Sequence, residues 1–451
     1  MRVGISLSAS LAVSTLAFAA PALGQELARQ GTLSFSQGLE YSDNISLSAT
    51  ARSGFTSRTG VDLLLRTETR TQVLTFGIGT DLVGEFGGDV TDDEFDFEST
   101  RASVLYTREG ATSEFRFTGS YTETQLDEAA FDLGDGSGLI FSEGSVTRTS
   151  LGFGLTTGVD GPFEVTVNGR YRNLDYQDTV DPDLVDEDST SLDATARMRI
   201  SPALTMRALV GVTKTEEDDL LSTEREERFV GLGLETETAG GLSIVGDVLF
   251  DTTEITDTTP STRQDDGVGL DLDITQDRPD GALNVALSSR IDEAGRRSTA
   301  EVTRSFDMPS GEIAFSLGVL DQEGEDSLQV IGGLEYFREL PRGGITASLR
   351  QDASSRDGAA FLNTLASLNY AQEINEISGW SAGISYTASD RLGSVDEDSR
   401  ATATFTYTRE LAEDWSMSTG VEHTRVTDTG TPDRSSNAIF FNIRRDITFG
   451  F

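Results

Sequence analysis

The chain is organised around segments in which apolar and polar residues alternate strictly. Residues 268–275 (VGLDLDIT), 401–408 (ATATFTYT) and 191–200 (SLDATARMRI) each carry apolar side chains at every second position. Because successive side chains of a β-strand point to opposite faces, this period of two predicts strands with one apolar and one polar face. After the first 25 residues, no stretch approaches the roughly 20 apolar residues of a membrane-spanning helix.

The connections between these segments alternate in length. Short turn signals lie at 108–112, 159–162, 201–203, 238–241, 278–281, 308–311 and 340–344. Longer polar stretches lie at 124–144, 174–189, 214–227 and 251–267. Strand, tight turn, strand and long loop therefore repeat, which fits either a propeller or a barrel.

The polar face decides between these two architectures. Inner strands of a propeller blade are covered on both sheet faces and should be apolar on both, whereas here one face stays rich in Thr, Ser, Gly, Asp and Arg. An apolar face backed by a polar one, with alternating short and long connections, is typical of an outer-membrane β-barrel. We predict an all-β fold in which residues 26–451 form one transmembrane antiparallel up-and-down β-barrel of about 22 strands, within a range of about 18–24. A secreted β-sandwich or β-solenoid is the alternative.

The first residues have the features of an export signal. Arg2 precedes the apolar run VGISLSASLAVSTLAFAA, and small residues follow it at 22–24. This arrangement predicts a cleaved signal peptide over residues 1–25 and localisation to the cell outer membrane. The alternative, an N-terminal transmembrane anchor, is disfavoured because the apolar run is short.

Composition excludes several functions. The chain has 46 Gly, no Cys, a single His and a formal net charge of −41. Without cysteine there are no disulfides, and such acidity argues against nucleic acid, whose phosphates require clusters of Lys and Arg. Neither zinc-ligand spacing nor a phosphate-binding glycine loop occurs, so we expect no cofactor.

The single histidine is a poor candidate for catalysis. His423 has the same parity as Trp415, Met417 and Val421, so we expect it to face lipid. Barrel enzymes with a catalytic histidine need it beside a nucleophile or an acidic pair at the mouth. We therefore expect that the protein is not an enzyme.

The last strand carries a recognisable pattern. In the terminal segment SNAIFFNIRRDITFGF, the residues Phe449 and Phe451 share one face with Ile439, Phe441 and Ile443. A terminal Phe on a strand with aromatic residues at alternating positions resembles the signal by which the bacterial barrel assembly machinery recognises outer-membrane barrels. The resemblance implies that this machinery is a partner of the C-terminal strand.

A second resemblance lies near the other end of the predicted barrel. The segment GLEYSDNISLS (38–48), with Tyr41, Asp43 and Asn44, resembles the opening strand and Tyr-x-Asp-Asn turn of the "β-barrel porin 2" family. The resemblance implies a signal peptide followed by one barrel, and some members are associated with exopolysaccharide export. It carries over no catalytic or binding residues.

Three acidic runs have two readings. Residues 87–98, 181–188 and 215–219 are expected to be solvated extracellular loops. Alternatively they bind a divalent cation such as Ca²⁺, which prefers carboxylate and carbonyl oxygens, and the ion bridges the loops to phosphates of lipopolysaccharide. None of the runs has the spacing of a known calcium loop, so no metal ligand is assigned.

The polar faces supply candidate lumen residues. By parity, the inward basic residues on successive strands are Arg116, Arg148, Arg170, Arg172, Arg197, Arg199 and Arg207, and further round the inward acidic residues are Asp247, Asp271 and Asp273. A basic wall facing an acidic one would create a transverse field that orients charged or dipolar solutes. The alternative is that these charges pair across neighbouring strands and only stabilise the wall.

The tetrapeptide YTRE at 106–109 and 407–410, and YFRE at 336–339, end alternating runs just before short turns. Tyrosine and tryptophan concentrate where a barrel leaves the membrane. We therefore predict a periplasmic aromatic girdle that contains Tyr106, Tyr336, Trp380, Tyr407 and Trp415.

The predicted lumen leads to two functional hypotheses. Only residues 26–30 precede the first predicted strand, whereas a TonB-type transporter would need a globular plug there, so we expect a lumen that is open or narrowed by the long segment 124–144. The first hypothesis is a porin-like passive channel for small solutes or for export of polysaccharide. The second is a structural or adhesive surface barrel whose acidic loops bind cations, without a transport role.

Overall fold

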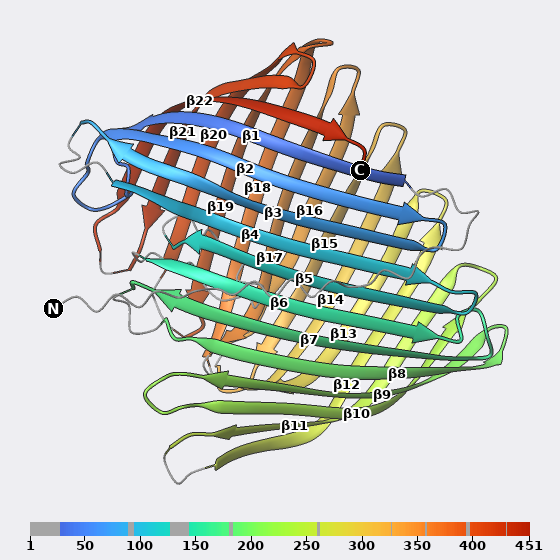
Figure 1. Cartoon of the computed structure of the whole chain (residues 1–451). Coiled ribbons are helices and arrows are strands. Elements are labelled where there is room, and N and C mark those ends of the chain that lie inside the picture. Colours follow the sequence, from blue (N-terminus) through green and yellow to red (C-terminus); the bar gives the residue numbers. More distant parts are fainter. Residues whose placement is uncertain are drawn as a thin grey trace.

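In the computed structural model, the chain forms a closed antiparallel barrel of 22 strands (Figure 1). The structure describes residues 28–88, 94–126, 144–179, 184–258, 262–325, 327–356, 359–393, 397–429 and 431–451. Each strand pairs with the next along the chain, and β1 also pairs with β22, which closes the sheet. No helix in the described part of the chain is long and apolar enough to cross a membrane.

The strands are β1 (Ala28–Ser42), β2 (Gly54–Thr69), β3 (Gln72–Phe86), β4 (Glu94–Glu109), β5 (Ser113–Gln125), β6 (Ser145–Thr157), β7 (Phe163–Gln177), β8 (Glu187–Ser201), β9 (Leu204–Glu217), β10 (Glu224–Glu237), β11 (Leu242–Thr256), β12 (Thr262–Arg278), β13 (Gly281–Asp292), β14 (Gly295–Met308), β15 (Gly311–Gln322), β16 (Gln329–Leu340), β17 (Gly343–Arg356), β18 (Ala359–Asn375), β19 (Ser378–Arg391), β20 (Glu397–Ala412), β21 (Trp415–Thr427) and β22 (Arg434–Phe449). The predicted fold class and the strand number of about 22 are therefore confirmed.

The outer wall of the barrel carries an uncovered apolar belt. Leu232, Leu317 and Val268 are 65%, 67% and 61% exposed, and all lie on the face that alternation predicted to be apolar. A soluble protein does not leave so many large apolar side chains on one continuous surface. A closed sheet also leaves no unpaired strand edge for lipid to meet, so the belt and the closure together fit a membrane-spanning barrel.

The strands extend further than the sequence predicted at the end with the longer connections. Residues 214–227 were predicted to form a loop, but β9 continues to Glu217 and β10 begins at Glu224. Polar side chains maintain the ladder beyond the apolar belt, because Glu217 and Arg225 of these strands form an ion pair. The β13–β14 connection at this end is also tight, since β13 ends at Asp292 and β14 begins at Gly295.

A small apolar cluster packs at the same end, against the inner wall of β5, β6 and β7. Leu126, Val146, Leu174 and Leu184 are buried, and Tyr176 packs against them. Leu126 is the last described residue before the segment predicted to fold inward on Phe131, Leu139, Ile140 and Phe141, and these four residues lie outside the described ranges, as does the predicted signal peptide at 1–25.

Candidate functional site

The lumen is the candidate functional site, and its wall carries all ten predicted lumen charges on strands β5–β12. The opposite parity positions of these strands hold exposed apolar residues such as Phe153, Leu192 and Val210. The predicted basic residues therefore come from β5–β9 and the acidic ones from β11 and β12.

Several of these arginines form ion pairs with inward carboxylates. Arg172 lies 2.8 Å from Glu187, and Arg197 lies 3.2 Å from Glu164. Arg148 is also engaged with other groups. Neighbouring carboxylates therefore compensate part of the positive charge on the wall. The transverse field across the lumen stays a prediction.

Arg207 and Asp247 form the one ion pair between the predicted basic and acidic sets. Arg207 Nη1 lies 3.1 Å from Asp247 Oδ2, although the two residues belong to β9 and β11. Both pair in register with Gly233 of the intervening strand β10. A Cβ added at Gly233 would overlap the Asp247 carboxylate, so the ion pair passes over a position that only glycine leaves open.

The same arrangement recurs elsewhere in the lumen. Arg101 of β4 bonds to Asp62 of β2, with Nε to Oδ1 at 2.7 Å, across Gly79 of β3. A Cβ at Gly79 would overlap Asp62 Oδ1 and crowd Arg101 Nε. These inner-face glycines therefore allow arginine and aspartate two strands apart to meet.

An arginine that was not among the predicted lumen residues forms ion pairs with the acidic residues of β11 and β12. Arg290 of β13 lies 2.9 Å from Asp251 and 3.0 Å from Asp271, in a third pairing that crosses a glycine, here Gly269. Asn284 donates to Asp273 at 2.7 Å. The alternation rule would have placed Arg290 in the lumen, because Arg290 shares the inward face of β13 with Ala286 and Ser288, whereas Leu287 faces outward.

Three of the predicted arginines have no side-chain partner among the described residues. Arg116, Arg170 and Arg199 are exposed, lie on β5, β7 and β8, and face the lumen. Arg116 and Arg170 pair in register with Gly154 and Gly152 of β6. The guanidinium groups flank these two glycines, over which the polar side chains of Thr118 and Asn168 lie. Two neighbouring positive charges without carboxylate partners make this part of the wall attractive to anionic groups.

A polar cavity of about 260 Å³ lies near the long-connection end of the lumen. It is lined by Arg172, Glu187, Ser189, Thr213, Thr215, Arg225, Glu227, Glu293 and Ser355. Arg225 pairs with Glu217 of β9 and, at 2.9 Å, with Glu293 of the β13–β14 turn. The lining reaches from β7 to β17, so side chains from distant strands narrow the lumen here. Sequence analysis missed Arg225 and Glu227 because it placed them in a loop and assigned them no face.

The predicted girdle residues lie at the short-turn ends of their strands. Tyr407 pairs in register with Trp380, and the Trp380 ring lies 5.0 Å from that of Tyr370. The guanidinium carbon of Arg445 lies over the Trp415 ring, 5.4 Å from its centroid. Tyr106 and Tyr336 likewise occupy outward positions near short turns. These positions fit an interfacial girdle, which stays a prediction.

The seam between β1 and β22 contains both terminal motifs. Near the short-turn end, the Phe449 ring covers Gly31, where a Cβ would overlap it. Near the other end, the Asp43 carboxylate accepts hydrogen bonds from the backbone and side-chain amides of Asn437, both at 2.7 Å. These bonds lower the pKa of Asp43, the backbone bond most strongly. Asn44 donates to Ser435 O at 3.0 Å.

His423 lies beside this seam. It pairs in register with Asn437, and Nδ1 of its ring lies 2.9 Å from Asn437 Oδ1. Of the acidic runs, residues 89–93 and 181–183 lie outside the described ranges. Within those ranges, no group of three or more His, Asp or Glu residues is arranged to hold a metal ion.

Comparisons with known proteins agree on the fold. No family model matches the sequence, and no curated protein matches it either. Among solved structures, the barrel is similar to the FrpB iron transporter from Neisseria meningitidis, with a TM-score of 0.59, 8% identity, and coverage of 94% of this chain and 83% of that one. It is also similar to the ferric-catecholate import receptor Fiu from E. coli K12, with a TM-score of 0.59, 9% identity, and coverage of 93% and 81%.

A mutant of the ferric enterobactin receptor PfeA from Pseudomonas aeruginosa is a third similar structure, with a TM-score of 0.54, 9% identity, and coverage of 93% and 80%. At these identities the likeness concerns the fold, which is that of an outer-membrane β-barrel. The comparisons do not identify the specific family that Tyr41, Asp43 and Asn44 resemble, so membership of that family stays an expectation.

Proposed function

We propose that this outer-membrane β-barrel is a porin-like passive channel for small solutes, with polysaccharide as a second class of cargo. The observation that carries the proposal is the lumen wall itself, on which Arg116, Arg170 and Arg199 present exposed guanidinium groups without a partner in the described chain. Charges that only stabilised a wall would be expected to pair with neighbours. Exposed, uncompensated charges in a lumen instead act on passing solutes.

The solved structures with this fold lend support of a general kind. These structures include an iron transporter, a ferric-catecholate import receptor and a copper transporter. A transport role is therefore a reasonable expectation for this barrel, and the cargo is a separate question because identity is low. We assign the chain no catalytic activity and no cofactor.

The route to the membrane is part of the proposal. We propose that residues 1–25 direct export, that the barrel assembly machinery recognises the last strand with Phe449 and Phe451, and that lipopolysaccharide contacts the acidic connections, with Ca²⁺ as a bridging ion. We also propose that the chain is a member of the "β-barrel porin 2" family.

Planar-bilayer recording of the purified barrel, with liposome swelling in sugars of increasing size, tests the channel. Stable openings and size-dependent swelling are expected. A folded barrel that neither conducts nor admits sugars would overturn the channel in favour of the structural or adhesive surface barrel. Retention of the heat-modifiable electrophoretic mobility of a folded barrel is the control for both measurements.

A further inference from the structure

A polar cavity of about 480 Å³ lies on the inner wall around the seam between β1 and β22. One row of its lining residues pairs in register across β22, β1, β2 and β3 and consists of Phe440, Glu40, Thr56 and Glu85. In the next row of the wall, Gly38 of β1 pairs with Arg58 of β2. The cavity therefore combines an aromatic ring, carboxylates and a glycine on neighbouring strands.

The depth of the cavity follows from the glycine. Gly38 faces inward between Arg58 of β2 and Asn442 of β22. Among the described atoms apart from its chain neighbours, a Cβ added at Gly38 would meet none nearer than the Arg58 backbone oxygen, at 3.8 Å. A side chain at this position would therefore fill the cavity without displacing the wall.

The lining carries an excess of negative charge. Glu40, Glu85 and Glu98 supply three carboxylates against the single guanidinium of Arg58, which leaves an excess of two negative charges. Such a cavity attracts cations and repels anions. Because no three acidic residues in the described ranges are arranged to hold a metal ion, these carboxylates surround a volume instead of converging on one point. The charge therefore suits an organic cation.

An aromatic ring forms one side of this cavity. Phe440 pairs in register with Gly420 of β21, and its ring lies over that glycine, where an added Cβ would overlap the ring. One face of the ring is thus directed toward the wall, and the ring also lines the cavity. The face of an aromatic ring attracts a cation, because the ring quadrupole places negative charge there.

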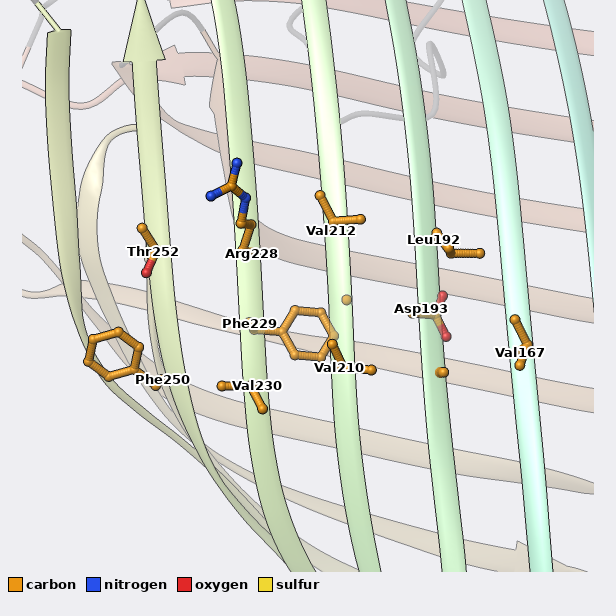
Figure 2. Close-up of a pocket in the computed structure, with 12 residues that line it drawn as sticks. Val167, Leu192, Asp193, Val210, Val212, Arg228, Phe229, Val230, Phe250 and Thr252 are labelled. Atoms are coloured by element: carbon orange, nitrogen blue, oxygen red, sulfur yellow. The ribbon is translucent and has the colours of Figure 1, made fainter.

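The same arrangement occurs on β10 with a cation in place. Phe229 faces inward and lies over Gly211, its register partner on the preceding strand β9. Figure 2 shows the Phe229 ring extending from β10 toward the strand that carries Val210. The guanidinium carbon of Arg290 lies 5.3 Å from the centroid of this ring.

Carboxylates complete the arrangement around Phe229. The guanidinium of Arg290 lies 2.9 Å from Asp251 and 3.0 Å from Asp271. An inward phenylalanine over a glycine thus forms, together with two carboxylates, a site for a cation that the chain itself supplies. At Phe440 the corresponding carboxylates border a cavity.

We propose that the cavity around Phe440 binds an organic ammonium ion. The cation lies against the ring face of Phe440 and is attracted by Glu40 and Glu85, as Arg290 is by its two aspartates. The site deepens the proposed function, on which it rests for access to the lumen, because it names organic cations as one class of solute.

Choline and its uncharged isostere 3,3-dimethylbutan-1-ol are matched probes, because they share a shape and differ in charge. The full-length folded barrel in uncharged detergent is titrated with each probe at a salt concentration of about 150 mM, which screens long-range attraction. The trimethylammonium proton resonance of choline should move upfield, as expected over a ring face, with a dissociation constant of about 1 mM or lower. The alcohol should bind at least about tenfold more weakly.

Variants assign the binding to this cavity. Gly38→Leu fills the cavity and should weaken choline binding about tenfold or more. Phe440→Leu should weaken it about fivefold and abolish the upfield shift, and Glu85→Gln should weaken it about threefold. Ser385→Leu, at an inward position of β19 opposite Thr402, is the matched control and should bind choline as the wild type does. Phe229→Leu controls for the loss of an inward ring elsewhere.

Three results would overturn the site. These are equal affinity for the uncharged alcohol, unchanged choline binding in folded Gly38→Leu, and a neutral hexose that occupies the cavity in preference to choline. Phe440 also covers Gly420, so Gly38→Leu and Glu85→Gln keep the test decisive if Phe440→Leu fails to fold.

Binding in detergent is measured separately from conductance. A barrel that binds choline but does not conduct would contradict the proposed channel and leave the site in place. A conducting barrel that does not bind choline would contradict the site and leave the channel in place.

Discussion

Arg207 and Asp247 form an ion pair at 3.1 Å across an intervening strand, and Gly233 is the residue over which their side chains meet. Their side chains are only 14% and 10% exposed. The pair therefore depends on three strands at once: a basic residue on β9, an acidic one on β11 and no side chain on β10.

Removing one member of this pair should cost more than removing both. Arg207→Ala leaves the Asp247 carboxylate buried without its partner and should lower the free energy of unfolding by about 3 kcal/mol. The double variant Arg207→Ala with Asp247→Ala should lose less, because no charge remains uncompensated. Thermal unfolding in detergent, followed by heat-modifiable mobility, measures both. A double variant that is less stable than Arg207→Ala would contradict the pairing.

Gly233 should tolerate no side chain while the pair is present. Gly233→Ala introduces a Cβ where the Asp247 carboxylate lies, so we expect a destabilisation of about 1–3 kcal/mol. The same substitution in an Asp247→Ala background should be milder. Gly246→Ala is the matched control, because a Cβ there would make only an ordinary 3.5 Å contact with Leu272. Equal losses at Gly233 and Gly246 would rule out the steric argument.

The β1–β22 seam should depend on Asn44 more than on Asp43. Asn44 is 3% exposed, donates to Ser48 O and Ser435 O, and accepts from Ser48 N–H. Asn44→Ala should therefore lower the free energy of unfolding by about 2 kcal/mol, because a buried side chain loses three hydrogen bonds at once. Asp43→Ala, at an exposed position, should lose about 1 kcal/mol or less. Urea unfolding in micelles measures both losses. A larger loss for Asp43→Ala than for Asn44→Ala would contradict the structural role of the buried Asn44 side chain.

Acid should abolish the contribution of Asp43. Hydrogen bonds from Asn437 hold the folded-state pKa of Asp43 below its ordinary value. A carboxylate with a lowered pKa stabilises the fold fully above its unfolded-state pKa, near about 4, and this contribution is lost as pH falls through the folded-state pKa. The difference in unfolding temperature between the wild type and Asp43→Ala should therefore shrink below a pH of about 4.

His423 requires a control in that experiment. Its positive charge also lowers the pKa of Asp43. Repeating the comparison in a His423→Gln background removes this second influence on the Asp43 carboxylate. A difference that stays constant from pH 7 to pH 3 in that background would show that Asp43 contributes nothing through its charge.

The exposed arginines should influence ion selectivity more than the paired ones. Replacing Arg116, Arg170 and Arg199 by Gln removes three positive charges from the lumen wall, so the reversal potential in a salt gradient should move toward cation preference. Arg172→Gln should have a smaller effect per charge, because Glu187 already compensates that guanidinium at 2.8 Å. Charge reversal at Arg170 and Arg172 that leaves selectivity unchanged would exclude a lumen field.

The sequence by itself determined the class of fold, the approximate strand number and the face of the side chains within the alternating segments. In residues 191–200 and 268–275 the alternation assigns every side chain to one side of its strand, because this property depends only on neighbouring residues. The same parity placed Arg207 and Asp247 in the lumen. The resemblance of residues 38–48 to a known family also pointed to Tyr41, Asp43 and Asn44 near the end of the first predicted strand.

Tertiary structure alone decided which of these groups meet. Asp43 bonds to Asn437, 394 positions away in the chain, and Arg225 bonds to Glu293 in a turn three strands further on. Such contacts depend on the register of every strand and on how the closed sheet is staggered, and closure is a property of all 22 strands together. Local alternation cannot encode it, so the β1–β22 seam forms only when the barrel closes, and the ion pairs over glycine form only when three neighbouring strands are in register.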